Sequence, residues 1–252
     1  MIDTHCHLNL GPLADDVAGA VRQAAVVGVE RIIVPGVSVA TSLLAVEVSK
    51  QFATVYAAVG IHPQEDGSGS VSDIEKLLQD EPTVVAVGEV GLDFSNGTDG
   101  SALQYSRFEA QVLLAKKYGK PVIVHSRDAY SQTAEVLHAI GYSNAVIHCF
   151  TGTYDQACTL LNLGCLISVT GIITYPSAAA LREAVSRMPL SQLMLETDAP
   201  YLAPNTHRGQ SNKPEYLPEV AHVLATLKGV SVQKIDTVTT ATAERFFSLP
   251  HA

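Results

Sequence analysis

The 252-residue sequence lacks the features of several protein classes. Its apolar runs fall short of the roughly 18 residues that a membrane helix needs, and no basic segment followed by an apolar one opens the chain like a signal peptide. Its four cysteines form no CxxC pair. We therefore expect a cytoplasmic protein with reduced thiols and no membrane partner.

Basic residues are also scarce, with 16 lysines and arginines against 25 acidic residues and a formal net charge of −9. A protein that grips long stretches of nucleic acid usually carries a basic face, and the sequence contains no basic run. If the substrate is nucleic acid, we expect a single-stranded end whose phosphate charge is countered by metal ions. The hydrophobic fraction of 47% is enough for a sizeable core and argues against disorder.

Short β-branched segments alternate with helical patterns along the whole chain. Most of the strand-like segments are almost continuously apolar, as parallel strands buried on both faces are. The predicted strands are 2–5, 31–37, 55–62, 83–91, 120–126, 144–150, 165–171 and 192–198. The predicted helices are 14–27, 40–52, 72–79, 104–118, 131–140, 155–163, 177–186, 215–227 and 232–247.

This alternation predicts one α/β domain over residues 1–252, folded as a (β/α)8 TIM barrel. A doubly wound open sheet is the alternative. That fold would usually show a glycine-rich phosphate turn after its first strand, where this chain has HCHLNLGP.

Residue types that bind metals follow the predicted strands at their carboxyl ends. His5 and His7 would share one face of the first strand, while Cys6, and likewise Cys149 near the sixth, would point away from the site. The third, fourth, fifth, sixth and eighth strands end in His62, Glu89, His125, His148, and the pair Glu196 and Asp198. In a TIM barrel these ends meet at one mouth, where catalytic groups lie.

Each of these residues also has an ordinary interpretation. A single histidine after a strand is more often a hydrogen-bonded structural residue, and an isolated carboxylate is more often a helix cap or a solvated charge. Their convergence favours a metal site, because imidazoles and carboxylates suit Zn²⁺, Mn²⁺ or Fe²⁺. Six such ligands suit two ions bridged by a carboxylate, and Glu89 is the natural bridge because it is central in strand order.

The motifs DTHCHL, GIHP, AVGEVGLD, PVIVHSRDA, VIHCFTG, GIITYP, LETDAPYLAP and RGQSNKPEYLP occur in this order over the whole chain. Together they resemble the TatD family of metal-dependent hydrolases, within the amidohydrolase-like barrels. The resemblance implies hydrolysis of phosphoester bonds, typically the 3′→5′ degradation of single-stranded DNA.

The resemblance also implies a binuclear site for two divalent cations, Zn²⁺, Mg²⁺ or Mn²⁺. The implied ligands are His5, His7 and Asp198 at one cation and His125 and His148 at the other, with Glu89 between them. His62, Arg127 and Glu196 match positions that the family uses near the site, for substrate contacts or for orienting the ligands.

Two segments depart from the family pattern. The stretch SNGTDGSALQYSRFEAQ after Phe94 stands where many members have a tyrosine-rich stretch, and Gln210 and Ser211 stand where a basic residue is common. These departures place the chain nearer to a less characterised, YjjV-like branch of the family, and they leave the substrate open.

The favoured hypothesis is hydrolysis of a phosphodiester by a water that two metal ions activate. Asp198 is the predicted general base, with Glu89 as the second catalytic residue, and Glu196 is expected to orient a histidine. Arg127 and Arg208 are predicted phosphate contacts because guanidinium groups match phosphate oxygens, although a surface ion pair is an even alternative for Arg208. We expect a monomer.

Two other hypotheses stay open at this point. One is a binuclear amidohydrolase or lactonase that acts on a small amide or ester. Many such barrels bridge their metals with a carbamylated lysine, and the strand ends named above carry no lysine. The other is a barrel without enzymatic activity, in which the histidines are structural.

Overall fold

The computed structural model describes residues 1–65, 69–97 and 101–250, and its strands form one eight-stranded parallel sheet in the order β1 to β8. The strands are β1 Ile2–Asp3, β2 Arg31–Pro35, β3 Val55–Val59, β4 Val84–Asp93, β5 Val122–Arg127, β6 Ala145–Ile147, β7 Leu166–Val169 and β8 Leu193–Leu195. Thr4 N donates to Leu195 O at 3.0 Å and Asp198 N donates to His5 O at 2.8 Å, which joins the first and last strands into a barrel. The predicted (β/α)8 barrel is confirmed.

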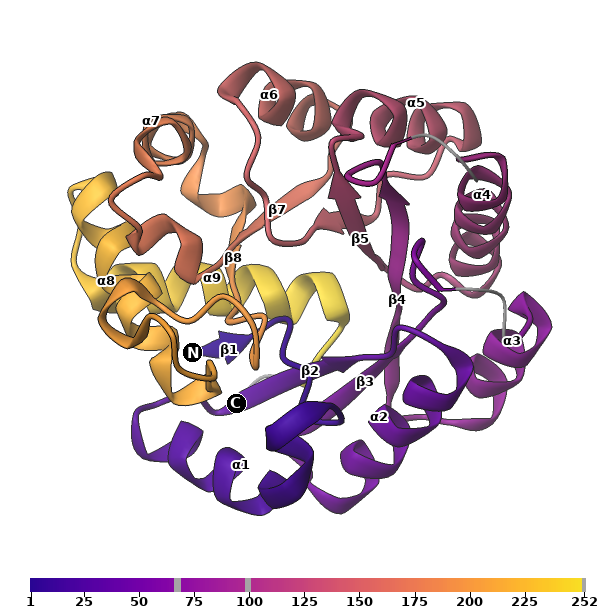
Figure 1. Ribbon diagram of the computed structural model, residues 1–252, viewed down its shortest axis with the longest axis horizontal. Coiled ribbons are helices and arrows are strands. Elements are labelled where there is room, and N and C mark those ends of the chain that lie inside the picture. The colour runs from indigo at the N-terminus through magenta and orange to yellow at the C-terminus, as the bar shows by residue number, and fades with distance from the viewer. Residues whose placement is uncertain (66–68, 98–100, 251–252) are drawn as a thin grey trace.

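Helices surround the sheet, and Figure 1 shows α1 to α8 on its outside. They are α1 Val17–Val26, α2 Val39–Gln51, α3 Val71–Asp80, α4 Ser101–Tyr118, α5 Tyr130–Ile140, α6 Tyr154–Asn162, α7 Ala179–Arg187, α8 Leu217–Lys228 and α9 Val232–Phe247. Shorter 3-10 turns are η1 Gly11–Asp16, η2 Gly171–Thr174, η3 Leu190–Gln192, η4 Asn205–His207 and η5 Pro214–Tyr216. Within the described ranges, no helix is both long and apolar enough to cross a membrane.

Local sequence sets the helix boundaries. Ser38 and Thr153 begin α2 and α6 with capping boxes, and Gly141 ends α5 in the left-handed conformation at φ 63°. The first helix begins later than residue 14, where the sequence predicted it. The Asp16 side chain accepts a hydrogen bond from Gly19 N at 2.8 Å, so α1 starts there and residues 11–16 form the 3-10 turn η1 instead.

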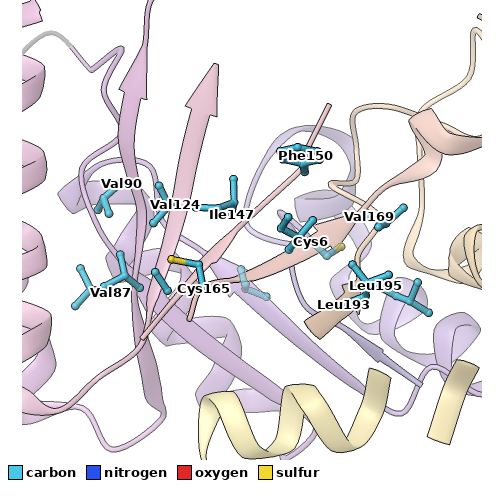
Figure 2. Close-up of a cluster of buried hydrophobic side chains, with 14 of the residues drawn as sticks. Cys6, Val87, Val90, Val124, Ile147, Phe150, Cys165, Val169, Leu193 and Leu195 are labelled. Atoms are coloured by element: carbon cyan, nitrogen blue, oxygen red, sulfur yellow. The ribbon is translucent and has the colours of Figure 1, made fainter. Parts of the chain in front are cut away.

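The hydrophobic core has two parts. The larger lies between the strands and the outer helices, and Figure 2 shows members of it, including Val87 of β4, Val124 of β5 and Leu193 of β8. The smaller combines one side chain from each of several strands with Phe246 and Phe247 of α9. Helix α9 therefore closes the end of the barrel where the strands begin, and the other end is left for the site.

Candidate active site

A cavity of about 790 Å³ opens where the strands end, and it collects most of the residues that the sequence singled out. The candidates that line it are His7, His62, Glu89, His125, Arg127, His148 and Asp198. His5 lies directly behind this surface with none of its area exposed, and its ring stacks on that of His148 at 4.1 Å between centroids.

Glu89 occupies the centre of the cluster. It lies within β4, and its backbone N–H donates to Gly36 O at 2.8 Å. Its Oε2 faces Nε2 of His5 at 3.3 Å and Nε2 of His7 at 3.8 Å. Its Oε1 faces Nδ1 of His125 at 3.0 Å and Nε2 of His148 at 2.9 Å. The carboxylate thus lies between two pairs of imidazoles and presents one oxygen to each.

Asp198 completes the first group. Its Oδ1 is 3.6 Å from Nε2 of His5 and 3.4 Å from Nε2 of His7, and these two nitrogens are 3.2 Å apart. Burial disfavours the charged form of Asp198, but the hydrogen bond from His7 and the charge of His5 outweigh burial and lower its pKa. Asp198 therefore stays ionised and available as an acceptor.

The second group has a third imidazole. Nε2 of His62 is 3.4 Å from Oε1 of Glu89, and its ring meets that of His125 edge-on at 4.4 Å between centroids. Ligand-type atoms of His62, Glu89 and His125 all lie within 4.8 Å of one another. His62 is therefore about as near to the cluster centre as the histidines that the sequence proposed as ligands, although it was assigned to substrate or supporting contacts.

The buried carboxylates and imidazoles of this cluster shift one another's pKa values toward the charged forms. Burial would raise the pKa of Glu89, but the imidazoles of His148, His62 and His125 lower it well below its usual range. Burial would lower the pKa of His148, but Glu89 and Glu196 raise it well above normal. A carboxylate among converging ring nitrogens suits a bound cation, because imidazole and carboxylate are both ligands of divalent metals.

Glu196 stands behind His148. Its Oε1 is 3.5 Å from Nδ1 of His148, and its two oxygens also accept hydrogen bonds from Cys149 N and the Ser168 hydroxyl. The distance to His148 places the two groups within ion-pair range, yet they form no hydrogen bond of good geometry. Glu196 is 1% exposed and does not line the cavity, so it can touch a histidine but not a substrate.

Asp93 plays the corresponding part for His125, and sequence reasoning missed it. Its Oδ2 is 2.8 Å from Nε2 of His125, while its Oδ1 accepts from Ser95 N at 3.0 Å. Gln104 of α4 holds the Asp93 backbone, with Oε1 accepting from its N–H at 2.8 Å. Its position in the sequence could have predicted it. Asp93 follows Glu89 by an even number of residues in one strand, which places both side chains on the cavity face.

Asp3 is a second buried carboxylate that the sequence did not single out. It accepts from Thr197 N at 2.9 Å and from the Thr197 hydroxyl at 2.6 Å, and more weakly from His5 N at 3.3 Å. Burial raises its pKa to about 7 in spite of those hydrogen bonds. It joins β1 to the turn that carries Asp198, so its role is to position the loops that carry the first group.

Of the two arginines predicted to contact phosphate, only one lines the cavity. Arg127, at the end of β5, is exposed and lines the cavity, with no ion pair to its side chain among the described residues. Arg208 does not line the cavity, because its guanidinium lies over the ring of Tyr175 at 4.8 Å. The structure therefore brings Arg127, but not Arg208, to the cavity.

The two cysteines that neighbour the histidines in sequence, Cys6 and Cys149, lie in different surroundings. Cys6 is fully buried in the apolar core, where Figure 2 shows it near Val169 and Leu195, and it does not line the cavity, as expected. Cys149 lines the cavity, so the expectation that it faces away was wrong. Strand β6 ends at Ile147 and Cys149 has a left-handed φ of 48°, so simple alternation does not reach it.

Comparisons with known proteins identify the family to which this chain is similar. Residues 2–248 match the family described as TatD related DNase. The crystal structure of YjjV, a TatD homologue from Escherichia coli, superposes with a TM-score of 0.95 at 34% identity, covering 99% of this chain and 98% of that one. The uncharacterized metal-dependent hydrolase YabD of Bacillus subtilis is 33% identical, and the alignment covers 99% of each chain. The 3′-5′ ssDNA/RNA exonuclease TatD of Edwardsiella piscicida is 34% identical, over 99% of this chain and 100% of that protein.

Proposed function

We propose an exonuclease activity for this chain, which belongs to the TatD family of metal-dependent hydrolases. In this proposal it removes nucleotides from the 3′ end of single-stranded DNA, with two divalent cations held in the cavity. The observation that carries the proposal is the orientation of Glu89, whose Oε2 faces His5 at 3.3 Å while its Oε1 faces His148 at 2.9 Å. A carboxylate shared between two ligand groups is what a two-metal hydrolase needs.

The residues present fit two cations. His5, His7 and Asp198 would hold one, His125 and His148 the other, and Glu89 both. The ring nitrogens of His5 and His7 face each other at 3.2 Å, and those of His125 and His148 at 3.3 Å. Such pairs bring lone pairs together unless a proton or a cation lies between them. The number of imidazoles favours Zn²⁺ or Mn²⁺ over Mg²⁺, which prefers oxygen ligands.

The charge of the cavity supports a phosphate substrate that arrives together with cations. Its described lining carries four carboxylates, from Glu65, Glu89, Asp93 and Asp198, and a single arginine, Arg127. Without bound cations, this mainly acidic lining would repel a phosphodiester. When bound, the two cations would offset the phosphate charge and lower the pKa of an attacking water.

The chain's own residues supply the remaining steps. The Asp198 carboxylate takes the proton of the attacking water and returns a proton to the oxygen that leaves, which is general acid–base catalysis. Arg127 pairs with a phosphate oxygen at the open side of the cavity. Asp93 accepts from the outer nitrogen of His125, and the Glu196 carboxylate lies within ion-pair range of the outer nitrogen of His148, so that the inner nitrogens point to the cavity.

The size of the cavity favours a strand end. A volume of about 790 Å³ falls within the range of small-molecule sites and leaves room for one or two nucleotides, but not for a duplex. The Edwardsiella relative is named for activity on single-stranded DNA and RNA, in the 3′ to 5′ direction. Both observations point to hydrolysis at one end of a single strand.

An amidohydrolase or lactonase is the less favoured function. The bridging position holds the carboxylate of Glu89, and no lysine is among the described residues that line the cavity. The lysine-bridged arrangement common in amidohydrolase barrels therefore has no counterpart in the described part of the site.

The test is a metal-reconstitution assay. The purified protein is stripped with a chelator, its metal content is measured, and Zn²⁺, Mn²⁺ or Mg²⁺ is added back. Substrates are 5′-labelled single-stranded DNA, the same strand in a duplex, RNA, a phosphomonoester and a lactone. We expect two cations per chain and stepwise shortening of the single strand from its 3′ end. Hydrolysis of the lactone with every nucleic acid left intact would overturn the proposal.

A further inference from the structure

The cavity has two chemically different walls. Its apolar lining residues follow β1, β2, β7 and β8, which are neighbours once the barrel closes between β8 and β1. They are Leu10, Val37, Ile172, Tyr201 and Leu202. The opposite wall, formed at the ends of β3 to β6, presents mainly polar groups such as Gln64, Arg127 and Thr151. The Glu89 cluster lies between the two walls, so a phosphate held there has an apolar side and a polar side.

Tyr201 is the prominent feature of the apolar wall. It is 53% exposed although it is a large aromatic residue, and its exposed surface lines the cavity. The ring meets that of His7 edge-on, with centroids 5.8 Å apart and an interplanar angle of 75°. Tyr201 N donates to Asp198 O at 2.9 Å, so its backbone is fixed next to the first ligand group.

The exposure of Tyr201 gains meaning from its apolar neighbours in the cavity. A single exposed apolar side chain is ordinary, but Tyr201 lines the cavity together with Leu10, Val37, Ile172 and Leu202, and such a contiguous apolar patch marks a ligand-binding surface. The ligand of this wall must be flat and apolar, and it must lie within reach of a phosphate held at Glu89. A nucleobase joined to that phosphate through its sugar meets these conditions.

We propose that the apolar wall (Leu10, Val37, Ile172, Tyr201 and Leu202) binds the base of a nucleotide that flanks the scissile phosphate, by stacking on the Tyr201 ring. The proposal rests on the nuclease function proposed above and adds an orientation to it. The next backbone phosphate then lies toward Arg127 on the opposite wall. Because every base has a flat apolar face, this contact tolerates any sequence but requires that a base be present.

The test compares protein variants with substrates that lack one base. Tyr201→Ala removes the ring, Tyr201→Phe keeps it without the hydroxyl, and Leu113→Ala removes an equally exposed (53%) side chain on the outer helix α4. Each metal-loaded protein is given three single strands of the same sequence. One is intact, and the other two carry an abasic sugar on one or the other side of the scissile phosphate.

With the intact strand, we expect Tyr201→Ala to raise KM and the dissociation constant by between about 5- and 150-fold, the range of one base–aromatic stack. With one of the two abasic strands, Tyr201→Ala should behave like the parent. Tyr201→Phe and Leu113→Ala should match the parent on all strands. Metal content is measured in every variant because Tyr201 touches His7, and it should not change.

The possible failures are distinguishable. If the parent protein neither binds nor cleaves any strand with any of the three metals, the nuclease function itself is wrong, and the base site falls with it. If the parent cleaves DNA but Tyr201→Ala weakens binding of all three strands equally, or has no effect, the nuclease function stands and the stacking proposal is overturned.

Discussion

Substitution of Asp93 should weaken metal binding without touching a metal ligand. Its Oδ2 lies 2.8 Å from Nε2 of His125, and a carboxylate can only accept, so Nε2 carries the proton in this contact. Nδ1, which points at Glu89 from 3.0 Å, is then the nitrogen that is free to bind a cation. In Asp93→Ala the proton can move to Nδ1 and the ring can turn, and both changes oppose binding.

The magnitude follows from the contact that is lost. Asp93 is 4% exposed, so its hydrogen bond to His125 is a buried contact to a charged group, a class that contributes about 1.5–3 kcal/mol. That corresponds to a loss of roughly 10- to 150-fold in affinity, close to the 10- to 100-fold usual for carboxylates that support metal-bound histidines. The loss should fall on the cation held by His125 and His148, and the cation at His5 and His7 should be retained.

The assay is a competition titration of the stripped protein with Zn²⁺ or Mn²⁺ against a chelating dye, which resolves the two affinities. Asp93→Asn should lose less than Asp93→Ala, because its amide oxygen can still accept from Nε2. Ser95→Ala is the matched control, since the Ser95 hydroxyl donates to the other oxygen, Oδ1, at 2.5 Å. Two unchanged affinities in a folded Asp93→Ala protein would refute the reasoning, and His125 would then be oriented by its packing.

Four further outcomes are expected. Asp198→Asn, assayed with saturating metal, should lower turnover by roughly 10²–10⁴-fold on every substrate, and turnover near that of the parent would move the base role to another group. Arg127→Ala should raise KM for a phosphodiester by only about 2- to 5-fold, because the side chain is exposed, and should leave an uncharged ester unaffected; equal effects on both would make the arginine structural. Cys149→Ser should leave the measured metal content unchanged, since the thiol lies 3.8 Å from the Thr170 hydroxyl and belongs to no cluster of ligand-type groups among the described residues; loss of metal would contradict this. Chelation should lower Tm by about 5–10 °C when the metal had been present at a hundredfold its Kd, and a calorimetric scan that shows no shift would mean that folding and metal binding are not coupled.

The sequence by itself determined the order of the elements and the type of fold. Each strand of the barrel overlaps a segment that the apolar runs had predicted, although β4 and β5 run one or two residues past the predicted ends, because strands buried on both faces are almost continuously apolar. The family followed from motifs in fixed order. The sheet topology confirms the predicted barrel, and the comparisons confirm the family. The convergence of the histidines at one mouth could also be anticipated, since parallel strands in a barrel end on the same side.

Only the tertiary structure decided which atoms meet. The sequence cannot say that the two oxygens of Glu89 face different pairs of histidines, or that Asp93 reaches His125, because both depend on how neighbouring strands are placed in register. Cys149 entered the cavity because a left-handed backbone broke the alternation on which its prediction depended. Arg208 was drawn away by Tyr175, a partner 33 residues earlier in the sequence. Local patterns determine which residues can reach the mouth of the barrel, whereas contacts between distant segments determine what each of them touches there.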